Sequence, residues 1–156
     1  MSMMHYVLGA PGAGKSSVIE PLRATAPEWV VLDWDFLMEP ASELARSPIP
    51  QAPWAWDIYA DLIHATVRSI GPRPVCLFTV CTPDELEQWP QGRWTVLDCA
   101  DEERTRRLAD RGEDEDVIGE SLADAAQYRA LGLPSIDTTS RSINEVAQEL
   151  AARLAN

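Results

Sequence analysis

The chain has 156 residues and a formal net charge of −12 at pH 7, from 13 lysines and arginines against 25 aspartates and glutamates. Its length suits one domain with one core, and its 46% hydrophobic and 24% charged residues are ordinary for a globular protein. Nucleic-acid binding needs clustered basic residues, so the acidic balance argues against such a partner. The sequence contains neither a long apolar run nor a secretory signal pattern, so we expect a cytoplasmic protein without a membrane partner.

Short apolar runs alternate along the chain with stretches of helical spacing. Runs at 6–8, 29–32, 75–80 and 94–97 predict buried parallel strands, and 134–137 is a weaker fifth candidate. Helical spacing follows the first run and recurs at 57–70, 101–111, 117–131 and 143–154. This alternation predicts one α/β domain, residues 1–156, built on a parallel sheet.

Three local features interrupt these elements. Four prolines between Glu39 and Trp54 predict a broken helix and a loop after the second strand. In the acidic run 111–117, Gly112 is expected to end one helix before another begins, which makes the run a candidate mobile element. Pro21 falls inside the first predicted helix, where it should remove a hydrogen bond and kink the helix.

The first strand is followed by "GAPGAGKS", residues Gly9 to Ser16, which satisfies the pattern G-x-x-x-x-G-K-[ST] in full. Such a loop turns successive backbone N–H groups and a helix N-terminus toward a phosphate, which only a glycine-rich backbone can approach closely. Lys15, the chain's only lysine, would then reach the β- and γ-phosphates, and the Ser16 hydroxyl would ligate Mg²⁺. The alternative is a glycine-rich turn with a surface lysine. The predicted cofactor-binding residues are Gly9, Ala10, Pro11, Gly12, Ala13, Gly14, Lys15, Ser16 and Ser17.

Two classes of phosphate-loop protein are disfavoured by what the sequence lacks. A regulatory GTPase needs a second lysine in its guanine-reading motif, and the chain has none. The run 75–80 also ends without an acidic residue, so the magnesium-directed aspartate of large ATPases and motor-type proteins is missing there.

The second predicted strand instead ends in two carboxylates, Asp33 and Asp35, at the edge where ligands of open α/β sheets gather. With this D-x-D pair, the loop and the order of elements, the chain resembles the P-loop small-molecule kinases of the adenylate-kinase-like group, such as shikimate, gluconate, nucleoside and chloramphenicol kinases. The resemblance implies a three-layer P-loop NTPase fold, with a five-stranded parallel sheet and helices on both faces. It also implies ATP and Mg²⁺ as cofactors and phosphoryl transfer to a small acceptor.

The same resemblance assigns roles to individual residues. Lys15 and Asp35 become catalytic residues, with Asp35 the base that binds the acceptor hydroxyl, and Asp33 joins Ser16 as a residue on the metal side. Because the transition state of phosphoryl transfer is loose, orienting the hydroxyl is a sufficient role for this base. The alternative for Asp35 is a simple cap of the helix that follows the strand.

An arginine-rich helix follows the fourth predicted strand. Arg104, Arg107 and Arg111 share one helix face at spacings i, i+3 and i+7, where several guanidiniums can meet one anion. The resemblance implies a lid at about 104–130 whose arginines close over the ATP phosphates. We assign Arg107 and Arg111 as catalytic residues and Arg104 to cofactor binding, with Arg129 a weaker candidate. Ion pairs with neighbouring acids are the alternative for each arginine.

The loop before the last helix completes the nucleotide site that the resemblance implies. Residues 138–141 would border the adenine, and Arg141 is assigned to cofactor binding. The same loop also suits helix capping, because Glu145 lies three residues after Ser142. The two roles are compatible.

The region 36–70 is the predicted acceptor-binding insertion. It is poor in arginine and rich in acids, which favours an uncharged or cationic acceptor such as a nucleoside or an antibiotic-like alcohol over a nucleotide monophosphate. Trp54 and Trp56 either line this site or only pack, and His64 is expected to be structural. A nucleotide-binding sensor or an NTP hydrolase remains the alternative function, and a monomer or a homodimer the expected assembly. The candidate aromatic lining is Trp34, Phe36, Trp54, Trp56 and Tyr59.

Overall fold

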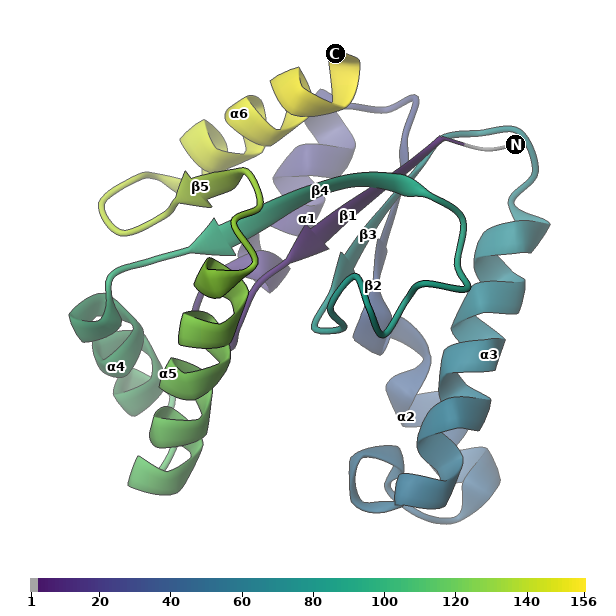
Figure 1. The fold of residues 1–156 in the computed structure, drawn as a ribbon, viewed down its shortest axis with the longest axis horizontal. Helices are drawn as coiled ribbons and strands as arrows, with labels where there is room; N and C mark the ends of the chain where they lie inside the picture. Colours follow the sequence, from purple (N-terminus) through teal and green to yellow (C-terminus); the bar gives the residue numbers. More distant parts are fainter. Residues whose placement is uncertain (1–2) are drawn as a thin grey trace.

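The computed structural model describes residues 3–156, which form one twisted parallel sheet with helices on both faces (Figure 1). The strand order is β2-β3-β1-β4-β5, and each neighbouring pair is parallel. This confirms the predicted fold class. The strands are β1 Met4–Leu8, β2 Val30–Asp33, β3 Val75–Thr79, β4 Gly92–Asp98 and β5 Ser135–Asp137. The α-helices are α1 Lys15–Thr25, α2 Met38–Ala45, α3 Pro53–Ser69, α4 Asp101–Asp110, α5 Glu115–Ala130 and α6 Ile143–Ala155.

The sheet is central because its inner strands are apolar on both sides. Every residue of β1 and β3 is buried, as expected for strands covered by helices on both faces. Leu8 at the end of β1 pairs in register with Thr79 of β3 and Val96 of β4. The carboxyl ends of neighbouring strands therefore meet at one edge of the sheet, and the loop after β1 opens at this edge.

Two layers of helices cover the sheet. On one face α1 and α6 pack together over a core that includes Val7, Leu22 and Leu150. On the other face α3 covers β1 and β3 through residues such as Ile63, while α5 covers β4. Figure 1 shows the β3–β4 connection running between α3 and α5. Within the described residues, no helix is both long and apolar enough to cross a membrane.

The predicted interruptions have specific structural outcomes. α1 contains Pro21 but continues to Thr25, so the proline does not end the helix there. The proline-rich stretch forms α2, the short 3₁₀ turn Ile49–Gln51 and the start of α3, which begins with Pro53. Proline is well tolerated in a first helical turn, where its missing N–H has no helical partner, so α3 begins earlier than its apolar spacing predicts.

The connection between α4 and α5 is short. Gly112 has a φ of +84° in the turn after α4, in agreement with its predicted role at a helix end. Asp114 then caps α5 by accepting a hydrogen bond from the Val117 N–H at 2.9 Å.

Two glycine positions give opposite predictions for stability. A Cβ on Gly92 would lie 2.6 Å from the Met4 carbonyl oxygen, because β4 passes close to β1 there, whereas a Cβ on Gly119 would meet nothing within 4 Å. We expect Gly92→Ala to lower the free energy of unfolding by about 1–3 kcal/mol, measured by urea denaturation. Gly119→Ala, inside α5, is the matched control and should raise it by about 0.5–1 kcal/mol. Equal effects of the two substitutions would contradict the close approach of β4 to β1.

Candidate functional site

The loop between β1 and α1 presents backbone N–H groups at the carboxyl edge of the sheet. Gly12 and Gly14 have φ values of +84° and +93°, which other residues adopt only with strain. Gly14 is the N-cap of α1, and no side chain caps the helix there. The N–H groups of the first turn have no helical partners, so the loop and the start of α1 form a binding site for an anion.

The carbonyl groups of the same loop, from Gly9 to Ala13, are each bound by a side chain. Lys15 Nζ donates to the Gly9 carbonyl. The other donors come from α4 and from the segment after β5: Arg104 to Ala10 at 3.3 Å and Pro11 at 2.6 Å, Arg107 to Gly12 at 3.1 Å, and Thr138 to Ala13 at 2.9 Å. The loop carbonyls are therefore bound by side chains, and the Ala13 N–H is bound to the Ala10 carbonyl within the loop at 3.1 Å, which leaves the amides at the start of α1 for an anion.

Lys15 lies half-buried among groups of both charges. Burial of the ammonium group lowers the pKa of Lys15 to about 8. Arg104 and Arg111 lower it further, while Asp33 and Asp35 act in the opposite direction. An anion bound in the loop would stabilise the ammonium form of Lys15, so this environment favours the binding of a negatively charged group.

The two carboxylates after β2 have different environments. Asp33 caps the 3₁₀ helix Trp34–Leu37 by accepting a hydrogen bond from the Asp35 N–H at 3.1 Å. The cap considered for Asp35 is therefore made by Asp33. The Asp35 carboxylate has no hydrogen-bond or ion-pair partner among residues 3–156. Its pKa is raised by partial burial and by the charge of Asp33, although Lys15 opposes the shift.

The three arginines predicted to share one helix face have different contacts. Arg104 is fully buried, and its hydrogen bonds to the loop are all to carbonyl groups, so it does not line the anion site as a direct ligand would. Arg107 is held by Glu103, by the Gly12 carbonyl and by Thr138. In the described part of the chain, only Arg111 of the three has a guanidinium without a hydrogen-bond or ion-pair partner, which leaves it available to a ligand.

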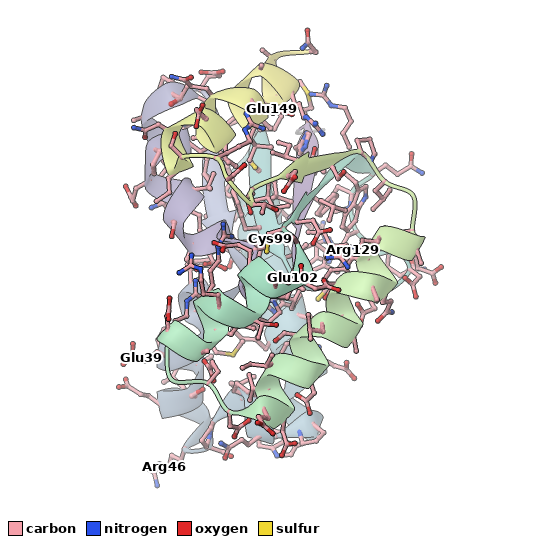
Figure 2. The ribbon with its side chains drawn as sticks, turned by 90° about the vertical axis from the view of Figure 1, so that its left-hand side faces the viewer. Glu39, Arg46, Cys99, Glu102, Arg129 and Glu149 are labelled. Carbon is pink, nitrogen blue, oxygen red and sulfur yellow. The ribbon has the colours of Figure 1, made fainter. Side chains whose placement is uncertain are left out.

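A cavity of about 270 Å³ lies beside the loop, between α1, α4 and the start of α6. Several residues that the sequence predicted for nucleotide binding share its walls, and Arg141 reaches it from the segment after β5. Arg141 also pairs with Glu149 of α6, whose position is marked in Figure 2. The predicted residues that line this cavity are Ala13, Gly14, Ser17, Arg107, Arg111 and Arg141.

Most of the aromatic residues considered for the acceptor site are packing residues. Trp34 is 1% exposed, with the rings of Trp56 and Tyr59 at centroid distances of 6.1 and 6.0 Å. Trp54 and Phe36 are different, because Trp54 is 65% exposed at the start of α3 and Phe36 is 40% exposed. His64 stacks on Trp89 at 4.7 Å, which is the structural role expected for it.

Asp98 was not identified from the sequence, and Thr138, predicted only as part of the segment that borders the adenine, has a further role in holding the loop. Thr138 is 5% exposed, and its hydroxyl lies within hydrogen-bond distance of the Ala13 and Asp98 carbonyls. Asp98 ends β4 and pairs with Arg104 at 2.6 Å. The only available signal was the position of Asp98 at the carboxyl end of a predicted strand, where Asp33 also lies.

Comparison with known proteins agrees with this geometry. Residues 6–127 match the family described as AAA domain. The chain belongs to this family of P-loop proteins. The match implies nucleotide binding, and it confirms the predicted P-loop NTPase fold. The chain gives no match among curated proteins.

Solved structures with a similar fold include small-molecule kinases. A tunicamycin resistance protein from Deinococcus radiodurans has a TM-score of 0.73 and 17% identity, covering 99% of this chain and 96% of that one. Shikimate kinase from Acinetobacter baumannii, in complex with shikimate, has a TM-score of 0.68 and 17% identity, covering 99% and 94%. A gluconokinase from Sinorhizobium meliloti 1021 has a TM-score of 0.64 and 20% identity, covering 98% and 93%. At these identities the likeness shows the fold, which is the kinase-like P-loop fold that the sequence predicted.

The lowered pKa of Lys15 predicts how nucleotide affinity depends on pH. Above pH 8, Lys15 of the free protein loses its ammonium proton. Bound phosphates would stabilise the charged form of Lys15, so ADP binding in this range should be accompanied by uptake of a proton. Affinity should therefore fall as the pH rises from 8 to 9.5, by up to about tenfold per pH unit. Calorimetry in buffers of different ionisation enthalpy measures the proton uptake, and Lys15→Met should abolish it. A wild-type affinity that stays constant over this range would contradict the assignment.

Proposed function

We propose that the protein is an ATP- and Mg²⁺-dependent phosphotransferase that moves the γ-phosphate of ATP to a hydroxyl group of a small molecule. One observation carries the proposal: a phosphate loop that contains Lys15 lies close to the unpartnered carboxylate of Asp35. The charges of Lys15 and Asp35 act on each other. A loop that only binds nucleotide has no need of a free carboxylate beside its lysine. A carboxylate at this point can bind and orient an acceptor hydroxyl.

The groups around the loop suit a nucleotide with its metal ion. The amides of the loop and Lys15 would hold the phosphates, while Arg111 is available to neutralise charge that develops during transfer. The Ser16 hydroxyl and Asp33 are the oxygen donors that would hold Mg²⁺, directly or through water. This small set of donors fits a metal ion that keeps several waters and binds substrate phosphates. Mg²⁺ would supply charge neutralisation at the transferring phosphate.

The surroundings of Asp35 favour an acceptor that carries no negative charge. Burial is the main cause of the raised pKa of the Cys81 thiol, beyond β3, but the charges of Glu85 and Asp35 both contribute, so a second carboxylate acts on this side of the site. A nucleotide monophosphate would meet repulsion from these carboxylates, whereas a nucleoside or an antibiotic-like alcohol would not. The tunicamycin resistance protein among the similar folds is consistent with an antibiotic-like acceptor.

The second candidate is a nucleotide-binding sensor or an NTP hydrolase. It is motivated by the end of β3 at Thr79, where the acid of many P-loop ATPases is missing. Measurement of ADP release with panels of nucleosides, sugars and antibiotics separates the candidates. A kinase requires an acceptor, a hydrolase releases ADP without one, and a sensor binds ATP with no acceptor-dependent release of ADP.

Lys15→Ala tests the phosphate side of the site. We expect kcat/KM for phosphoryl transfer to fall by about 100-fold or more, because a charge at the transferring phosphate is lost. Circular dichroism and thermal unfolding should show that the fold is retained, since the side chain is only half-buried and its charged form is disfavoured there. Full activity of Lys15→Ala would refute the proposed function.

Asp35→Asn tests the acceptor side. We expect kcat to fall by about 100-fold while the dissociation constant for ATP changes little, because Asp35 is assigned to the acceptor hydroxyl. Steady-state kinetics and ATP binding measured on the same preparation separate the two effects. The reverse pattern, in which ATP affinity falls but kcat does not, would remove Asp35 from the acceptor site.

A further inference from the structure

The Arg104 guanidinium is a buried charge whose hydrogen bonds to the phosphate loop are all to carbonyl groups. Among residues 3–156 it is the only lysine, arginine, aspartate or glutamate side chain that is buried, at 0% exposure. One terminal nitrogen, Nη1, donates to the Ala10 and Pro11 carbonyls at 3.3 and 2.6 Å. The other, Nη2, donates to Asp98 at 2.6 Å. The planar fork of arginine thus joins the loop to the end of β4.

Asp98 in turn links this contact to a different helix. Its second carboxylate oxygen accepts a hydrogen bond from Arg129 of α5 at 2.6 Å. Arg129 also donates to the Cys99 carbonyl at 2.9 Å and to Asp101 at 2.8 Å. Figure 2 shows Arg129 at the end of α5 beside Cys99, which leads into α4. A continuous chain of charged contacts therefore runs from α5 through Asp98 and Arg104 to the loop.

The close fit of the loop against Arg104 makes this contact specific. A Cβ on Gly12 would lie 3.0 Å from the Arg104 Cγ, so the loop packs directly on the arginine stem. An unpaired charge at this depth would be strongly unfavourable, and a hydrophobic residue would fill the space without that cost. What a hydrophobic residue would not supply is a donor for the Ala10 and Pro11 carbonyls.

We propose that Arg104 is a positioning residue for nucleotide binding, and that Asp98 and Arg129 hold it in place. By binding the loop carbonyls, this brace keeps the amides at the start of α1 turned toward the phosphates. Arg104 then sets nucleotide affinity without touching the nucleotide, and Arg129 extends this influence to α5. The inference rests on one part of the proposed function, the binding of a nucleotide by the loop. It does not require that phosphate is transferred to an acceptor.

The test compares the ADP affinity of three variants, measured by calorimetry in the presence of Mg²⁺. The temperature is kept well below the unfolding midpoint of each variant. Arg104→Lys keeps the charge but loses the fork, and we expect ADP to bind about tenfold more weakly. Arg129→Met removes one partner of Asp98 at a partly exposed site and should weaken binding by about threefold. Hydrogen exchange of the amides at 12–16 should be faster in both variants, which links the loss of affinity to the loop.

Arg23→Met is the matched control. Arg23, at the end of α1, also donates to a carboxylate, Glu20, and to a carbonyl, Val31, at 3.0 Å, but it does not contact the loop. Its loss should lower the free energy of unfolding without changing ADP affinity. Equal weakening of ADP binding by Arg23→Met would overturn the proposal, because general destabilisation would then explain the effect.

The remaining outcomes separate the brace from the proposed function. A folded Arg104→Lys with wild-type ADP affinity would overturn the brace while leaving the kinase proposal intact. If Arg104→Lys does not fold, Arg129→Met decides, and unchanged affinity there would overturn the brace. A wild-type protein that binds ADP but transfers phosphate to no acceptor would contradict the kinase proposal alone.

Discussion

The structure depends on how the phosphate loop satisfies its own carbonyl groups. A loop that turns its amides toward an anion must turn carbonyls elsewhere, and buried carbonyls without donors are costly. Here the donors come from Lys15, from two arginines of α4 and from Thr138 after β5. The anion site and the packing of α4 on the loop are therefore one arrangement, and neither can change without the other.

This arrangement explains how the chain uses its cations. Arginine, with its planar fork, joins carbonyls to carboxylates in several places behind and beside the loop, as at Arg104. The single lysine lies where a compact ammonium on a flexible stem can reach phosphates, at the cost of a lowered pKa in the free protein. Arginine therefore serves to hold parts of the protein together, whereas the lysine lies where a phosphate would bind.

The parts of the fold that could be predicted are those encoded locally. The strands around Leu8 and Val96 are continuous apolar runs, and the loop from Gly9 to Ser16 satisfies a specific eight-residue pattern in full, so both followed from the sequence. The role of Arg104 did not, because its spacing with Arg107 and Arg111 shows a shared helix face but not which part of that face is buried. Trp34 was ambiguous for the same reason, since only the packing of α3 shows that it belongs to the core.

The contacts of the α4 arginines also bear on which of them could neutralise charge during the proposed phosphoryl transfer. Arg104 binds Asp98 and loop carbonyls, and Arg107 binds Glu103, Gly12 and Thr138, so moving either guanidinium would break contacts that hold the loop. Arg111 follows α4 at the turn with Gly112 and has no such contacts within the described chain. Its charge already acts on Lys15. The arginine best placed to approach a transferring phosphate is therefore the one at the helix end, where movement does not disturb the loop.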